Sequence, residues 1–340
     1  MTIIPVRCCS ALLLAILLSA GVRADALFES HDAIDLTMQA SFGQIRRERD
    51  KSKSYPGTLK AGGQSFVVEV GVRGNNRLKR LNCSHPPLSI RFDEKEIEDT
   101  IFDHQKSLKL VVQCKKYGSY RDLLRKEYLV YRLFNLATDL SYRVRWLDLN
   151  YLDEDGEKRT EPAFFIERKS RVAKRAGLEK TDISRIKYTQ LESKSAAMVA
   201  LFQYIVANTD YSVVVATEGE CCHNAKILLA DGGEYTPIIY DFDSSGLVDA
   251  EYAKPNVSIR QKKVTDRVFR GYCRHLPELQ VAREQLLSLE PTMMTLMQED
   301  KVLSSKAVKK ATTFLRKSFS ILREDEHYEK YIVGKCRGEP

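Results

Sequence analysis

Apolar and polar residues alternate over residues 65–74, which predicts a strand in the first half of the chain. This stretch is rich in residues that favour strands, and Gly62-Gly63 predicts a turn before it. A second turn is predicted at 154–158, within the sequence EDGEK. The predicted strands are 65–74, 87–92, 107–114, 142–152 and 163–167.

One long amphipathic helix is predicted between these strands, over residues 120–137. At 100° per residue, Leu123, Val130 and Phe134 share one face of this helix. Glu127 falls in the middle of that apolar face. A carboxylate in such a place is costly unless a cation pairs with it.

Two interpretations of Glu127 remain open. It is either a glutamate at the rim that reaches solvent, or one partner of a buried ion pair with a basic residue of a strand. Lys109 and Arg91, on neighbouring predicted strands, are the candidate partners.

The second half of the chain is predicted to be mainly helical. Residues 193–208 are apolar almost all round, which predicts a buried helix. Residues 225–230 and 235–240 predict a hairpin, and a Lys-rich amphipathic helix follows near 307–322. A β-rich half with one helix, followed by a helical half, indicates the α+β fold class.

The N-terminus has the features of a secretory signal. Arg7 precedes an apolar run over 11–22, and cleavage after Ala24 or after Ala26 fits the small residues there. The alternative is an N-terminal membrane anchor, although the run is short for a span. We therefore expect a signal peptide over residues 1–24 and an exported protein, periplasmic, extracellular or in a eukaryotic secretory pathway, with no membrane span after cleavage.

Composition is that of a globular protein, with 43% hydrophobic and 29% charged residues. The net charge of +8 falls to +6 once Arg7 and Arg23 are removed with the signal. This modest excess suits acidic ligands and does not indicate nucleic-acid binding.

Six cysteines follow the predicted signal, which indicates disulfides in an oxidising compartment. We expect the adjacent Cys221 and Cys222 to pair with different partners. A zinc site built from Cys221, Cys222, His223 and Cys273 is the alternative, although vicinal cysteines lack the usual spacing of zinc ligands.

Two aspartates, Asp241 and Asp243, follow directly on the predicted strand 235–240. The sequence D-x-D-x-S-G matches the start of a calcium loop, but Tyr252 occupies the twelfth position, which needs a glutamate. A capped turn is a further alternative. It does not explain why two acids begin where a core strand ends.

The order of polar residues favours phosphoryl transfer. Asp210 follows the predicted buried helix, Asn224 begins a strand, and Asp241 ends the next strand. Phosphoryl transfer needs an Asp to orient the attacking hydroxyl, and an Asn and an Asp to hold metal. A hydrolase with Ser244-Ser245 and His223 or His275 is the alternative, but no G-x-S-x-G motif accompanies them.

These features resemble the CotH kinase-like family, the spore-coat type of atypical protein kinase, which is related to secretory-pathway kinases. The resemblance covers roughly Val70 to Gly246 and is most specific in the aspartate segment. Its stretches are VGVRGNN, PPLSIRF, KLVVQCKKYGSYRDLLRKEYLVYRLFN, AFFIERKSRVAKR, NTDYS, CCHNAKIL and PIIYDFDSSGLV. It implies a two-lobed kinase-like fold, with a β-rich N-lobe over 27–167 and a helical C-lobe over 168–340.

The resemblance also implies roles for single residues. Asp210 would be catalytic, and Asn224, Asp241 and Asp243 would bind Mg²⁺ or Mn²⁺. The expected activity is transfer of the γ-phosphoryl group of ATP to hydroxyls of an unknown protein substrate. The residues implied in nucleotide binding are Lys109, Arg91, Glu127, Glu167 and Arg73.

Two departures from the family pattern keep alternatives open. Tyr211 replaces a basic residue after the catalytic aspartate, and residues 213–222 form an insertion before Asn224. A pseudokinase that binds nucleotide without transfer is therefore one alternative. A secreted binding module stabilised by calcium is another.

Overall fold

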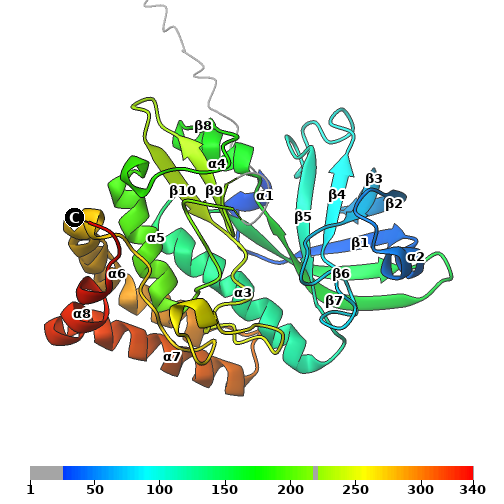
Figure 1. The fold of residues 1–340 in the computed structure, drawn as a ribbon. Coiled ribbons are helices and arrows are strands. Elements are labelled where there is room, and N and C mark those ends of the chain that lie inside the picture. Colours follow the sequence, from blue (N-terminus) through cyan, green and yellow to red (C-terminus); the bar gives the residue numbers. More distant parts are fainter. Residues whose placement is uncertain (1–25, 217–220, 340) are drawn as a thin grey trace, which may run out of the picture.

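Seven strands of the protein close into a barrel. The computed structural model describes residues 26–216 and 221–339. Around the barrel the strands follow the order β1-β2-β3-β4-β5-β7-β6 (Figure 1). Their bounds are β1 Ile34–Ala40, β2 Ser54–Ala61, β3 Gln64–Val72, β4 Leu88–Phe92, β5 Ser107–Val112, β6 Val144–Leu152 and β7 Lys158–Ile166.

The barrel closes where β1 pairs with β6 in parallel, with Ile34 opposite Leu147. The other neighbouring strands are antiparallel. Inward side chains alternate along each strand and form one apolar core. The short helix α1 (Ala26–Glu29) adds Leu27 and Phe28 to this core, at 0% and 1% exposure.

This closed barrel corrects the expected fold. The prediction of a two-lobed, kinase-like α+β fold with a β-rich N-lobe and a helical C-lobe is wrong. The prediction missed β1 and β2, and without them the strands offered no way to close the sheet. The pairing of β1 with β2 on one side and β6 on the other turns an open sheet into a barrel with accompanying helices.

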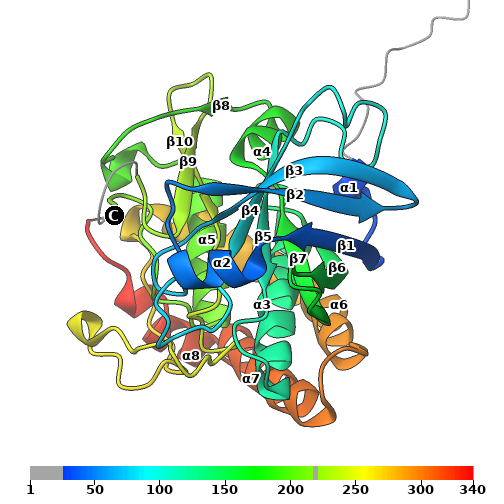
Figure 2. The ribbon, with the colours of Figure 1, turned by 90° about the vertical axis from the view of Figure 1, so that its right-hand side faces the viewer.

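The helices and a small second sheet pack beside the barrel (Figures 1 and 2). Helix α3 lies between the barrel and the later helices, because its aromatic residues contact both β6–β7 and those helices. The second sheet has the order β10-β9-β8. The bounds are α2 Phe42–Glu48, α3 Gly118–Ala137, α4 Lys169–Ala176, β8 Glu179–Lys180, α5 Ser193–Ile205, β9 Ala225–Leu229, β10 Tyr235–Ile239, α6 Leu276–Gln298, α7 Ser305–Arg323 and α8 Asp325–Tyr331.

Several predicted elements are confirmed. Helix α5 is buried at every residue from Ser195 to Ile205, as an all-round apolar sequence predicts. Strands β9 and β10 form the expected antiparallel hairpin. Gly62 and Gly63 make the expected turn, at φ values of 53° and 81° that favour glycine.

Disulfide bonds are present, as predicted for an oxidising compartment. They join Cys83 to Cys114, Cys273 to Cys336, and Cys221 to Cys222. The expectation of different partners for the adjacent cysteines is wrong, and the zinc alternative loses its thiolate ligands. Among the described residues, no helix is long and apolar enough to cross a membrane. The predicted signal peptide lies outside those residues.

Candidate functional site

Asp210 and Asn224 lie in direct contact, although 14 residues separate them. The Nδ2 atom of Asn224 donates to the backbone oxygen of Asp210 at 2.7 Å and to its carboxylate at 3.1 Å. The amide oxygen of Asn224 makes no hydrogen bond with the described residues.

His223 is the second partner of Asp210. Its Nε2 atom lies 2.7 Å from the Oδ1 atom of Asp210, and the two side chains are 40% and 47% exposed. Burial acts to raise the pKa of Asp210, but the hydrogen bond and charge of His223 and the amide of Asn224 outweigh it and lower that pKa. The hydrogen bond to Asp210 raises the pKa of His223. Both shifts favour the charged forms of the pair, a carboxylate on Asp210 and an imidazolium on His223.

Backbone contacts fix the turn that carries Asp210. The guanidinium of Arg270 donates to the carbonyl oxygens of Thr209 and Tyr211, on either side of Asp210. The side chain of Asn208 accepts the backbone N–H of Asp210 at 3.0 Å. These contacts hold the carboxylate in one orientation after the end of α5.

Asp241 follows the end of β10 by two residues. Its backbone adopts a φ of 63°, and its N–H donates to the hydroxyl of Tyr131 on α3 at 2.8 Å. Among the described residues its carboxylate accepts no hydrogen bond and forms no ion pair. Next to it, Phe242 is fully buried, with its ring 4.7 Å from that of Tyr131. The buried ring of Phe242 anchors the segment between the two aspartates.

Asp243 is buried and is bonded to two hydroxyl groups. It accepts from Tyr252 at 3.0 Å and from Ser244 at 3.2 Å. Burial and the neighbouring charge of Asp241 raise the pKa of Asp243 to about 6. Tyr252, which occupies the twelfth position of the calcium-loop pattern, thus contacts this carboxylate through its hydroxyl.

Glu127 belongs to a buried ion pair, as one of the two interpretations predicted. Its partner is Arg77, at 3.2 Å, rather than Lys109 or Arg91. Arg77 also donates to the backbone oxygen of Val112 at 2.7 Å. Burial, together with Asp243 and Asp241, raises the pKa of Glu127 to about 8, against the opposing effect of Arg77 and Arg73.

The remaining predicted nucleotide-binding residues separate into two groups. Arg73 donates to the backbone oxygen of Leu88, and the charge of Asp241 acts on its guanidinium. Lys109 places its Nζ atom 4.8 Å from the ring centre of Tyr240, the residue before Asp241. Both therefore lie beside the aspartate segment.

Arg91 and Glu167 are engaged differently. Arg91 is exposed on β4, where its neighbours across the strands are Glu69 and Ser107. Glu167 is buried and accepts from Arg175 at 2.7 Å and from the backbone N–H of Arg143 at 3.0 Å. Its carboxylate thus ties the end of β7 to α4.

Sequence patterns did not predict Arg77, nor His223 and Arg270 as partners of the Asp210 turn. The signal for Arg77 was present, because it follows Arg73 by four residues in the sequence RGNNR. The hydrogen bonds of His223 and Arg270 depend on the folded turn, so the sequence alone gave no signal for them.

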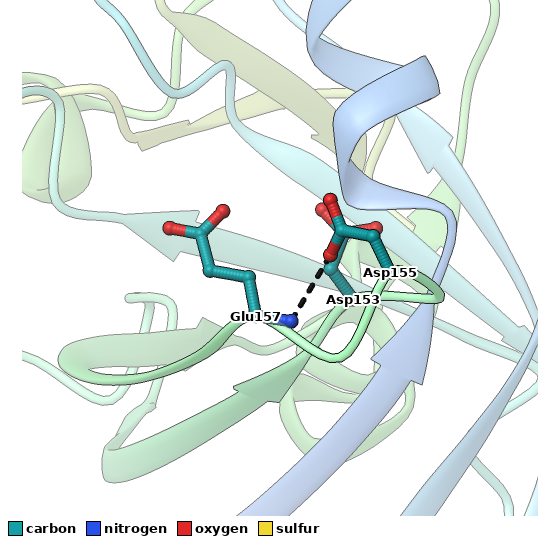
Figure 3. Close-up of side chains that lie close together, drawn as sticks. All are labelled: Asp153, Asp155 and Glu157. Atoms are coloured by element: carbon teal, nitrogen blue, oxygen red, sulfur yellow. Dashed lines mark hydrogen bonds between the residues drawn. The ribbon is translucent and has the colours of Figure 1, made fainter.

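A second acidic group lies on the barrel, far along the chain from Asp241. Asp153, Asp155 and Glu157, in the turn between β6 and β7, bring ligand oxygens within 4.8 Å of one another (Figure 3). Arg46 lies 3.7 Å from both Asp153 and Glu157, and Lys116 lies 3.7 Å from Glu157. These cations already balance much of the charge of the turn.

No protein-family model and no curated protein matches this chain. The chemistry of the site therefore has to be argued from its own contacts. Three carboxyl groups, those of Asp241, Asp243 and Glu127, lie near two permanent cations, Arg73 and Arg77. The Asp241 carboxylate, which has no partner among the described residues, the amide oxygen of Asn224 and the raised pKa values of Asp243 and Glu127 fit an additional divalent cation with oxygen ligands.

Proposed function

We propose that this protein transfers the γ-phosphoryl group of ATP to a hydroxyl group of a protein, with Mg²⁺ or Mn²⁺. The observation that carries the proposal is the contact of Asp210 with Asn224 beside Asp241. The resemblance to CotH-like kinases stays a prediction. Support for the proposal comes from the side chains and not from the overall fold.

Each residue of the site has a role in the proposed reaction. Asn224, Asp241 and Asp243 would hold the divalent cation, which supplies charge neutralisation of the phosphates when bound. Arg73 and Arg77 offer guanidinium groups, which suit phosphate oxygens. Glu127 holds Arg77 in place through the buried pair.

Asp210 is placed to receive the acceptor hydroxyl. As the hydroxyl oxygen bonds to the γ-phosphorus, the bond from that phosphorus to the leaving ADP oxygen breaks. The hydroxyl proton passes to the carboxylate of Asp210, which His223 contacts through its Nε2 atom. Because Arg270 and Asn208 fix the turn, the carboxylate does not have to reorient during the step.

The test measures binding and transfer separately. Thermal shifts with ATP should require Mg²⁺ or Mn²⁺, and label from γ-³²P-ATP should reach the protein itself or a mixture of Ser- and Thr-containing peptides. Asp210→Asn should keep metal-dependent ATP binding but lose transfer by about a hundredfold or more. Asp241→Asn should lose both, and Asp155→Asn, at the exposed turn, should lose neither.

Two results would contradict the proposed function. If the wild type shows neither metal-dependent binding of ATP nor transfer, the proposed function is wrong. If label from α-³²P-ATP reaches the product instead, the same residues transfer AMP and the reaction assignment is wrong.

A further inference from the structure

A basic loop lies next to the turn that carries Asp210. This loop, residues 254–266, has four exposed basic side chains in its first ten residues and no acidic residue among those ten. The basic residues are Lys254, Arg260, Lys262 and Lys263. Within the described part of the chain, none of these four side chains forms an ion pair or a hydrogen bond.

The buried side chain of Gln261 organises the basic loop. Its amide oxygen accepts the backbone N–H of Asn256 at 2.8 Å, and its amide nitrogen, Nε2, donates to the carbonyl oxygens of Val264 and Asp266. Asp266 in turn accepts the backbone N–H groups at 262 and 263. The loop therefore has a defined shape, and its lysine side chains are left to project outward.

The same glutamine joins the loop to the candidate site. The hydroxyl of Thr209, the residue before Asp210, donates to Gln261 at 2.9 Å. At the base of the loop, Gly246 packs so closely that an added Cβ would lie 2.8 Å from Thr265 and from Ala207. The loop is thus built directly onto the segments that carry Asp210 and Asp243.

The tip of the loop presents one apolar side chain. Val257, in the short 3₁₀ turn Val257–Ile259, is 78% exposed. Figure 2 shows this segment, in yellow, extending from the rest of the fold at the lower left. A single exposed apolar residue among unpaired cations suits a charged polypeptide better than a lipid bilayer, because membrane binding of this kind needs a larger apolar surface.

We propose that the basic loop binds an acidic segment of the acceptor protein. Four unpaired cations attract a run of Asp, Glu or phosphorylated residues. The contact of Gln261 with Thr209 joins the loop to the residue that precedes Asp210. This inference rests on the proposed function for its biological role, and docking itself is measured without nucleotide.

The experiment uses fluorescent peptides and the full chain without its signal. An acidic Ser-containing peptide, a basic one and a neutral one are titrated by fluorescence anisotropy at several salt concentrations. The test variant is Lys262→Glu with Lys263→Glu, and the matched control is Lys60→Glu with Lys95→Glu on the barrel, where both lysines are also exposed. Thermal melting confirms that both variants fold.

The acidic peptide should bind the wild type and the barrel variant equally, more weakly at high salt, and the loop variant about tenfold more weakly. Equal affinity for all three peptides, or an unchanged affinity of the loop variant, overturns the inference. So does binding of phosphatidylserine vesicles in preference to the acidic peptide. Metal-dependent ATP binding is measured in parallel. If the wild type binds the acidic peptide but does not bind ATP with metal, the proposed function is refuted and the docking site is supported.

Discussion

The protein carries two groups of acidic side chains that differ in how nearby cations balance their negative charges. In the β6–β7 turn, Asp153, Asp155 and Glu157 come from five consecutive residues, and Arg46 and Lys116 lie beside them. At the end of β10, Asp241 and Asp243 meet Glu127, which comes from a distant helix, and Asp241 has no partner among the described residues.

The difference shows that closeness of carboxylates alone says little about function. Neighbouring acids in a turn come close because the chain reverses there, and solvent and surface cations reduce the repulsion. Burying acidic side chains from separate segments together costs free energy. A fold keeps such a group only where another interaction compensates for that cost. The β10 group is therefore the stronger candidate for binding a cation.

The largest expected effect is on the free energy of unfolding, and it distinguishes the arginines that lie beside the two acidic groups. Arg77→Met should lower the free energy of unfolding by about 3 kcal/mol at pH 8, because it leaves Glu127 buried without its cation. Arg46→Met, at the turn, should cost less than about 1 kcal/mol. Urea unfolding measures both. Arg77→Met combined with Glu127→Met should recover most of the loss, and a double variant no more stable than the single one would contradict the explanation.

The next effect concerns metal affinity. Asp241→Asn should weaken Mn²⁺ binding about hundredfold, because it removes an anionic ligand that has no other partner. Isothermal titration calorimetry of the full chain measures the change. Asp155→Asn serves as the control and should leave the affinity within about twofold. Equal losses in the two variants would remove the distinction between the groups.

A third effect is the pH dependence of stability. The folded pKa of Glu127 is raised from 4.5 to about 8, so the folded state holds more protons than the unfolded state in this interval. His223, whose pKa is also raised, acts in the same direction. The free energy of unfolding of the metal-free protein should therefore fall by about 1 kcal/mol from pH 6.5 to about pH 7.5.

Two histidines oppose this fall in stability below pH 6.5, so the contribution of Glu127 is measured above that pH. His31 and His85 have pKa values lowered to about 4 and about 3, mainly by burial, so they destabilise the fold once pH drops below 6.5. The slope above pH 6.5 should become much flatter in Glu127→Gln, as measured by urea unfolding in a pH series. An unchanged slope would show that another group is responsible.

The smallest effect is expected at the turn itself. Asp155→Asn keeps an oxygen that can accept the N–H of Glu157, so the free energy of unfolding should change by less than about 0.5 kcal/mol. Added Ca²⁺ should not raise the melting temperature of the wild type more than that of this variant. A clear Ca²⁺-dependent rise in the wild type alone would make the turn a structural metal site.

Local patterns predicted the single elements well and the closure of the barrel poorly. Strand β1 alternates apolar and polar residues, so its signal was present in the sequence. Strand β2 contains Pro56 and Gly57, which weaken the pattern of a strand. Pairing with β1 begins only at Gly57, so the missing N–H of Pro56 costs no bond on that side. The parallel pairing of β1 with β6 leaves no local signal at all.

The candidate site shows the same division. Asp210, Asn224 and Asp241 were predicted from their order along the chain, and the structure places the first two in contact. The cation beside Glu127 was predicted on a strand, but Arg77 reaches it from the loop after β3. Which cation enters a buried pair depends on the path of that loop, and amphipathic periodicity does not encode it.

The closure of the barrel also sets an order of events during synthesis. Strands β1 to β5 can form a meander as each leaves the ribosome, because each pairs with the next. The far edge of β1 stays open until β6 arrives, since Ile34 pairs with Leu147. The β6–β7 hairpin then pairs with β1 on one side and β5 on the other. Until that hairpin is delivered, the nascent chain exposes two unpaired strand edges, and a chaperone that shields them would act in this interval.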